Sequence, residues 1–99
     1  MTEEEKKQQL DNVVLVGKKS VRTYAEAVMI QFNEKKSKEV ILKTRGNFIT
    51  RAINATEYLK RKEENIKVKE IKIGSESFRD KETDKEIYVS SIEITLTKD

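Results

Sequence analysis

The sequence predicts an α+β fold with the element order β-α-β-α-β-β and a long C-terminal β-hairpin that protrudes from the rest of the domain. Two observations carry this prediction: helical spacing of apolar residues after each of two short apolar runs, and two long segments of β-type pattern beyond Asn65. The chain has 99 residues, which suits a single domain that buries about 60 to 65% of its unfolded surface. We expect that domain to span residues 12–99, after a flexible, polar N-terminal tail over residues 1–11.

The first strand and the first helix are predicted between residues 12 and 32. Asn12 to Val16 is a continuous apolar run, which is typical of a strand buried on both faces. Ser20 then stands where the N-cap of a helix is expected. The apolar residues that follow are spaced by three or by one, as on one face of a helix: Val21, Tyr24, Ala25, Val28, Met29 and Phe32.

The same pattern repeats between residues 39 and 59. Glu39 to Thr44 is a second short strand, and Asn47 is positioned to cap the helix that follows it. A right-handed crossover would make the two strands parallel, so that both strand-to-helix loops open at the same edge of the sheet. Helical spacing in this second helix is kept by Ile49, Ala52, Ile53, Thr56 and Leu59.

The final third of the chain is predicted to form an antiparallel hairpin. Its first strand changes phase between Val68 and Ile71, which indicates a bulge or a change of packing surface. About 11 residues at about 3.3 Å each give about 36 Å, which is about twice the length of the first strand, so part of the hairpin should project as an arm. A two-stranded arm alone is marginal in water, and we expect a second copy of the chain to support its base in a homodimer. The apolar residues of the two strands are Ile66, Val68, Ile71 and Ile73, then Tyr88, Ile92, Ile94 and Leu96.

Composition argues against an enzyme. The chain has no Cys and no His, which removes thiolate nucleophiles, disulfides, the usual zinc ligands and the commonest general base. Glu63 and Glu64 form an acid pair, but they follow three basic residues at the solvated end of the second helix. We expect no catalysis, no cofactor and no metal site. Because the N-terminus lacks an apolar signal core and no apolar run approaches about 20 residues, we expect a soluble intracellular protein.

Positive charge is concentrated at the two strand-to-helix loops. The net charge is only +3, so its distribution is more informative than its sum. The cations of the first loop have no acid beside them between Gly17 and Tyr24, and those of the second loop flank Gly46. In chain order these basic residues are Lys18, Lys19, Arg22, Lys43 and Arg45.

The two basic loops predict an anion as the ligand. Each precedes a helix whose free N–H groups and dipole add to the side-chain charge. Neither loop has the glycine pattern of a Walker A or dinucleotide-binding motif, and a strip of cations beside a projecting hairpin fits a polymer of phosphates better. One Lys-Lys pair in a chain with 39% charged residues is more often plain solvated surface, so the second loop is what favours a site. Tyr24 and Phe32 have core spacing, and no base-stacking platform is predicted.

Three stretches of the sequence, NVVLVGKKSVRTY, VILKTRGNFITRAI and VSSIEITL, resemble the Alba family of archaeal chromatin proteins in their order and spacing. The resemblance covers nearly the whole chain, from Asn12 to Lys98. It implies a two-layer sandwich, a homodimer, and sequence-independent binding of double-stranded DNA and also of RNA. It further implies an architectural role on the chromosome in the cytoplasm, with contacts between neighbouring dimers on DNA.

The resemblance also implies roles for individual residues. Lys18 and Lys19 would contact the phosphate backbone, with support from Arg45 and its neighbours, and Lys18 matches a family lysine whose acetylation weakens DNA binding. Two departures are Ser20, where the family usually has proline, and Asn47, where it often has a basic residue. The candidate nucleic-acid-binding residues are Lys18, Lys19, Arg22, Lys43, Arg45, Asn47, Arg51 and Arg79.

Two further departures concern the arm tip and the second helix. The tip, FRDKETDKE, has three basic and four acidic residues, and Arg79 is its best candidate for a DNA contact. Glu63 stands where many Alba-like proteins have a phenylalanine that packs between neighbouring dimers, so we expect weak cooperativity on DNA. Two other functions remain open: an RNA-binding subunit of an RNA-processing particle, and a protein-interaction module that uses the hairpin as an edge strand.

Overall fold

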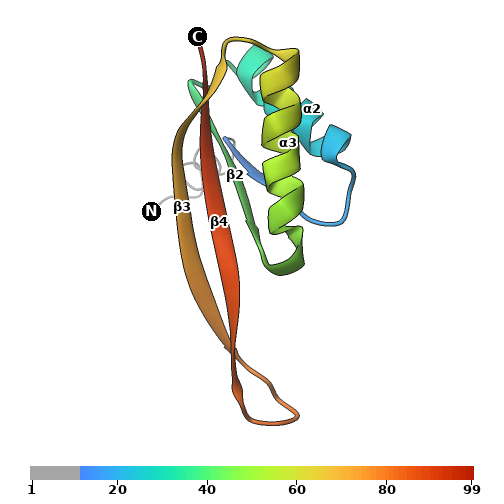
Figure 1. The fold of residues 1–99 in the computed structure, drawn as a ribbon, viewed down its shortest axis with the longest axis vertical. Helices are drawn as coiled ribbons and strands as arrows, with labels where there is room; N and C mark the ends of the chain where they lie inside the picture. The colour runs from blue at the N-terminus through green and yellow to red at the C-terminus, as the bar shows by residue number, and fades with distance from the viewer. Residues whose placement is uncertain (1–11) are drawn as a thin grey trace.

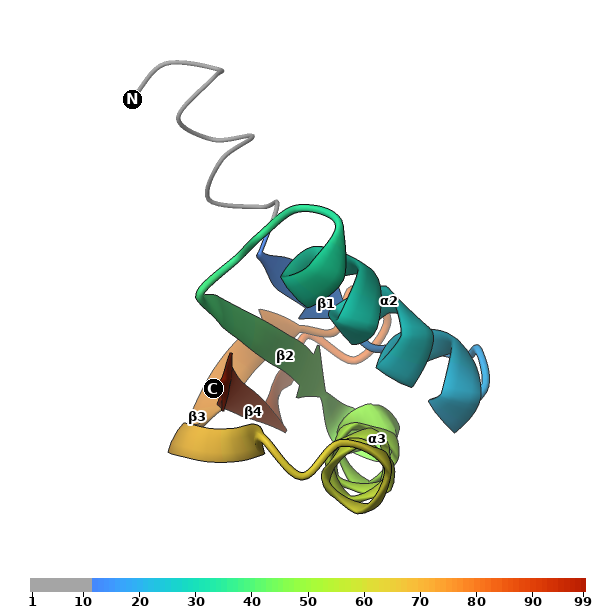
Figure 2. The same ribbon diagram turned by 90° about the horizontal axis from the view of Figure 1, so that it is seen from above.

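The computed structural model describes residues 12–99, so the tail expected over residues 1–11 lies outside the described residues. A four-stranded sheet forms one layer, and both helices lie on one of its faces (Figures 1 and 2). The predicted order and the two-layer α+β architecture are confirmed. The elements are β1 (Val13–Leu15), α2 (Val21–Asn33), β2 (Glu39–Arg45), the 3-10 turn η1 (Gly46–Phe48), α3 (Ile49–Lys62), β3 (Ile66–Arg79) and β4 (Glu86–Lys98).

The strands are arranged in the order β1-β2-β4-β3, with β1 parallel to β2 and the other pairs antiparallel. The predicted parallel start and C-terminal hairpin are therefore confirmed. The expectation that the first strand is buried on both faces is wrong, because the helices cover only one face of the sheet. Val14 and Val16 point toward the helices and are buried, whereas Leu15 points to the other face and is 66% exposed. We call these two sides the helix face and the open face.

The core lies between the helix face and the two helices. Tyr24 and Phe32 are buried in it, as their spacing predicted. In α3 the buried stripe is formed by Ala52, Ala55, Thr56 and Leu59. Ile53, which was expected in the core, lies at the edge of this stripe and is 43% exposed. The sheet, together with Val16 directly after β1, contributes further core residues: Val14, Val40, Leu42, Ile66, Ile92, Ile94 and Leu96.

The two helices begin in different ways. The Ser20 hydroxyl accepts a hydrogen bond from the Thr23 amide at 3.2 Å, so the predicted cap of α2 is confirmed. The predicted cap of the second helix by Asn47 is wrong. Gly46 turns the chain with φ = 64°, Asn47 lies inside η1, and α3 starts after Phe48 without a side-chain cap. A left-handed φ of this kind favours glycine, which explains why the sharp turn occurs at that position.

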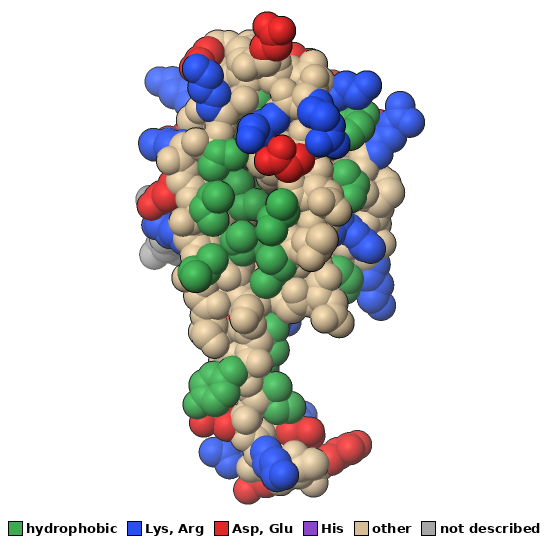
Figure 3. All heavy atoms as spheres, in the orientation of Figure 1, with side chains coloured by type: hydrophobic (Ala, Val, Ile, Leu, Met, Phe, Trp, Pro, Cys, Tyr) green, Lys and Arg blue, Asp and Glu red, His purple; other side chains and the backbone are tan. Residues whose placement is uncertain are grey.

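The hairpin of β3 and β4 forms the predicted arm. Its strands have 14 and 13 residues, and it extends well past the start of α3 (Figure 1). The register shifts between Val68 and Glu70, which confirms the predicted bulge. On the helix face, the edge strand β3 carries Ile71 and Ile73 beside the buried Ile94 and Ile92 of β4, and Tyr88 lies further along the arm. Ile71, Ile73 and Tyr88 are 56%, 84% and 67% exposed. Figure 3 shows hydrophobic side chains gathered on this side of the molecule, next to α3.

Within residues 12–99, neither helix combines the length and the apolar character needed to cross a membrane.

Candidate nucleic-acid interface

The segment of residues 16–20, which we call the lysine loop, joins β1 to α2 and is fixed by the hydroxyl of a core residue. The Tyr24 side chain is buried, but its Oη lies at the loop, where it accepts hydrogen bonds from the amides of Gly17 at 2.8 Å and Lys19 at 2.9 Å. One oxygen therefore satisfies two loop N–H groups on either side of Lys18. The sequence pattern identified Tyr24 as a core residue, and only the loop geometry reveals this second role.

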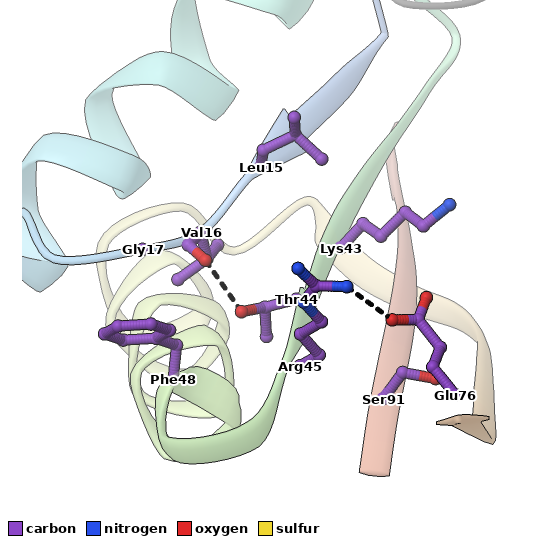
Figure 4. A pocket seen from close by; sticks show the side chains of 9 residues that line it. All are labelled: Leu15, Val16, Gly17, Lys43, Thr44, Arg45, Phe48, Glu76 and Ser91. Atoms are coloured by element: carbon purple, nitrogen blue, oxygen red, sulfur yellow. Dashed lines mark hydrogen bonds and ion pairs between the residues drawn. The ribbon is translucent and has the colours of Figure 1, made fainter. Parts of the chain in front are cut away.

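Two further side chains donate hydrogen bonds to carbonyl oxygens of the lysine loop. Arg51 donates from Nη1 to the carbonyl oxygen of Gly17 at 2.8 Å, and its guanidinium lies 5.9 Å from the centre of the Phe48 ring. Thr44, which is buried, donates from Oγ1 to the carbonyl oxygen of Val16 at 2.7 Å (Figure 4). The structure thus places Arg51, one of the sequence-predicted contact residues, in the support of the loop. Spacing along the chain gives no signal for these bonds because they join segments 34 and 28 residues apart.

Lys18 and Lys19 are exposed on this fixed loop. Among residues 12–99, no carboxylate forms an ion pair with either of them, and the first turn of α2 contains no acid. Arg22, one turn into the helix, differs because its Nε lies 3.6 Å from a carboxylate oxygen of Glu26. The two lysines therefore present their full charge to solvent beside the free N–H groups of a helix start.

The second basic cluster lies on the open face of the sheet. Lys43 and Arg45 alternate with the buried Thr44, as expected for successive residues of a strand. Both are already paired: Lys43 Nζ lies 3.8 Å from Glu93, and Arg45 Nη1 lies 2.8 Å from Glu76. Asn47 is exposed in η1, directly after this strand.

The two loops meet around a hollow of about 370 Å³. The amide of Val16 donates to the carbonyl oxygen of Lys43 at 2.9 Å, which ties the end of β1 to β2. Lys43 and Arg45 line the hollow (Figure 4), whereas Lys18 and Lys19 are not among its lining residues. The remaining lining residues are Leu15, Val16, Gly17, Thr44, Phe48, Glu76 and Ser91.

At the tip of the arm, the Arg79 side chain contacts another residue of the tip, Asp84. Its Nη1 lies 3.0 Å from a carboxylate oxygen of Asp84, and the Asp84 carbonyl oxygen is 3.5 Å away. The amide of Asp80 donates to the carbonyl oxygen of Lys85 at 2.8 Å and closes the turn. Arg79 remains exposed, but a carboxylate already compensates its charge.

Residues 12–75 match the family model named Alba. The chain belongs to the Alba family. It is 44% identical over 90 residues to the DNA/RNA-binding protein Alba of Methanococcus maripaludis, a match that covers 90% of this chain and all of the relative. It is 37% identical to the DNA/RNA-binding protein Alba of Picrophilus torridus over 89% of this chain and 97% of that one. Among solved structures, Alba from Thermoplasma volcanium matches with a TM-score of 0.78 and 35% identity, covering 88% of this chain and all of that chain.

In this Alba-family chain a second hollow, of about 440 Å³, lies between the two helices. Met29 and Ile30 of α2 line it on one side, and Tyr58 and Lys62 of α3 line it on the other. Lys62 Nζ lies 5.7 Å from the centre of the Tyr58 ring. Glu63, at the C-cap of α3, closes the rim with a half-buried side chain. Glu63 is therefore part of a largely apolar depression.

Removing the Tyr24 hydroxyl should loosen the lysine loop of this Alba-family chain. Tyr24→Phe leaves the amides of Gly17 and Lys19 without their protein acceptor, and we expect it to lower the free energy of unfolding by about 1 to 3 kcal/mol. Hydrogen exchange at these two amides should accelerate more than in the strands, and chemical denaturation gives the stability change. Tyr58→Phe, which removes a hydroxyl far from the loop, is the matched control. Equal effects of the two substitutions would contradict the role of Tyr24.

Proposed function

We propose that this Alba-family chain binds double-stranded DNA without sequence preference, and RNA as well, as an architectural protein of the chromosome in the cytoplasm. One observation carries the proposal: Lys18 and Lys19 stand unpaired, within the described residues, on a loop fixed by Tyr24, Thr44 and Arg51. A fixed pair of cations at a helix start binds phosphate without reading bases, because phosphate contacts carry no direct sequence information. The printed names of the Methanococcus and Picrophilus relatives, DNA/RNA-binding protein Alba, support the same ligand class.

The proposed interface has a graded set of contacts. Lys18 and Lys19 make the primary contacts, and acetylation of Lys18 would weaken them by removing a charge. Arg51 acts through the loop that it holds. The secondary contacts come from residues around the second loop and the arm, most of them already paired with carboxylates: Arg22, Lys43, Arg45, Asn47 and Arg79.

We also propose that the chain acts as a homodimer. The exposed side chains of Ile71, Ile73 and Tyr88 continue the helix face beyond the helices of the same chain. Apolar side chains gathered on one surface often mark an interaction site, and a second copy related by a twofold axis offers the same surface in return. Such a dimer would carry two lysine loops and two arms, which gives it the means to grip one duplex or to bridge two.

Equilibrium binding to matched DNA duplex, RNA duplex and single strands over a salt series tests the proposal. We expect binding to both duplexes with little dependence on sequence, and an affinity that falls linearly on a log–log plot as salt increases. A strong preference for RNA would replace the chromosomal role with that of an RNA-binding subunit. Absence of salt-dependent binding to any of these ligands would contradict the proposal and favour a protein-interaction module.

Cooperativity on long DNA should be weak because of Glu63. If neighbouring dimers meet at the hollow between α2 and α3, the contact must bury a carboxylate, and that is unfavourable without a partner. Glu63→Phe should increase cooperativity on a long duplex and leave affinity for a duplex that holds one dimer nearly unchanged. Comparison of the two binding isotherms measures both quantities.

The control for this prediction is Glu64→Phe. It adds the same ring one residue further on, at an exposed position that does not line the hollow. Cooperativity should rise only for the substitution at Glu63. Strong cooperativity of the unsubstituted chain would show that another surface makes the contact between dimers.

A further inference from the structure

Arg45 is held by two residues of the arm. Its Nη1 lies 2.8 Å from a carboxylate oxygen of Glu76, and its guanidinium carbon lies 4.8 Å from the centre of the Phe78 ring. Arg45 is the last residue of β2, whereas Glu76 and Phe78 belong to β3, on the far side of β4. The guanidinium therefore reaches across a whole strand to form these contacts. The dashed line to Glu76 in Figure 4 follows this path along the open face.

Small residues on β4 and β3 leave space for the Arg45 side chain to cross the sheet. In the sheet register Arg45 is opposite Ser91, and Ser91 is opposite Gly74. A Cβ at Gly74 would lie only 3.0 Å from the Ser91 Oγ, so the two residues leave a shallow track with no bulky side chain above it. Glu76 and Phe78 follow Gly74 at alternate positions and share its face. The arginine is thus directed toward a carboxylate by the shape of the sheet.

We propose that Glu76 occupies the place of a phosphate at Arg45, and that nucleic acid must displace this carboxylate to recruit the arginine. The inference rests on the proposed function and adds a residue that sets the affinity of the interface. A carboxylate and a phosphate present similar oxygen acceptors to the guanidinium, and both favour paired N–H donors. Phe78 binds a different part of the group, its π face, and can retain the guanidinium while the acceptor changes.

The exchange is feasible because the existing pair is exposed. The side chains of Arg45 and Glu76 are 57% and 42% exposed, and exposed pairs of this kind are weak and easily screened. A polyanion that is already bound at Lys18 and Lys19 offers several phosphates nearby. After the exchange, Glu76 remains close to the phosphate backbone as an unpaired negative charge, which opposes binding. Glu76 therefore lowers the affinity twice, by competing for Arg45 and by repelling the ligand.

Neutralising this carboxylate tests the proposal. Glu76→Gln keeps the size of the side chain and removes its charge, and we expect it to increase the affinity for a short DNA duplex about three- to tenfold at low salt. The salt dependence should become steeper by up to about one unit per protomer, because Arg45 no longer has a competing partner. Equilibrium titrations of the full chain across a salt series measure both effects.

The matched control is Glu39→Gln. Glu39 lies on the same strand and the same face as Arg45, pairs with Lys69, and is about 20 Å away at the other end of the strand. Glu39→Gln changes the net charge by the same amount as Glu76→Gln, so it reports the general effect of removing one acid. We expect it to increase the affinity for DNA less than Glu76→Gln does.

Arg45→Gln supplies the deciding comparison. In that background Glu76→Gln should give a smaller gain than it gives when Arg45 is present, since the competition is absent and only the repulsion between Glu76 and the ligand remains. A gain that is equal with and without Arg45 would overturn the exchange, and so would equal gains at Glu76 and Glu39 in the chain that keeps Arg45. If the unsubstituted chain binds no nucleic acid, the proposed function fails, and the exchange fails with it. Binding without any gain at Glu76 overturns the exchange alone.

Discussion

Replacing both Lys18 and Lys19 with alanine should weaken duplex binding about 50-fold per protomer at about 0.1 M salt, if each lysine neutralises one phosphate. The slope of log affinity against log salt should fall by about two units per protomer, and the loss should be similar for all sequences. The effect is expected to be large because neither lysine has a carboxylate partner within residues 12–99 and the loop is already ordered. Equilibrium titration over a salt series gives the affinity and the slope together.

Two further variants make this experiment specific. Lys35→Ala with Lys36→Ala removes another adjacent lysine pair, just beyond the opposite end of α2 and about 20 Å away, and should have little effect. Lys18→Gln removes one charge, as acetylation would. It should weaken duplex binding about sevenfold, since about 50-fold is expected when both lysines are replaced. An unchanged slope in the double alanine variant would remove the lysine loop from the interface.

Dimerisation should be abolished at micromolar concentration by Ile73→Glu. The unsubstituted chain is expected to sediment as a dimer, with the Ile73 side chain covered in both copies. Losing two buried isoleucines, at about 2 kcal/mol each, raises the dissociation constant about 10³-fold before the burial of two carboxylates is counted. Sedimentation equilibrium measures the mass, and circular dichroism checks that the monomer keeps its secondary structure.

Ile87→Glu is the matched control for the dimer. Ile87 lies on the same arm and is 45% exposed, but the register pairs it with Phe78 on the open face. This variant should remain a dimer, because the open face of the arm is not expected in the contact. A monomeric unsubstituted chain, or equal dissociation of both variants, would contradict the proposed dimer surface.

The features that could be predicted from the sequence are those encoded by neighbouring residues. The two helices, the Ser20 cap, the core positions of Tyr24 and Phe32, and the bulge after Val68 each depend on spacing within one segment. The place of Asn47 was predicted wrongly because the positive φ of Gly46 and the turn η1 depend on how β2 is joined to α3. Local spacing does not determine that geometry.

The parts of the site that could not be predicted depend on contacts between distant segments. Arg45 and Glu76 are 31 residues apart, and their pairing requires the register of three strands. The support of the lysine loop by Arg51 likewise requires the position of α3 over the sheet. Leu15 is exposed because both helices lie on one face, and a short apolar run does not reveal which faces are covered. The sequence therefore identified the basic residues, and the structure distinguishes free cations from paired ones.

The position of β1 at the edge of the sheet links the folding of this protein to its ligand. β1 has three residues and, within residues 12–99, pairs only with β2, whereas β3 and β4 pair with each other along almost their whole length. Short edge strands separate from a sheet at lower free energy than central ones, in local opening events that leave the rest folded. Such an opening would release the lysine loop while the hairpin stays intact. A phosphate backbone bound at Lys18 and Lys19 would oppose this opening, so that the ligand itself would close the weakest edge of the fold.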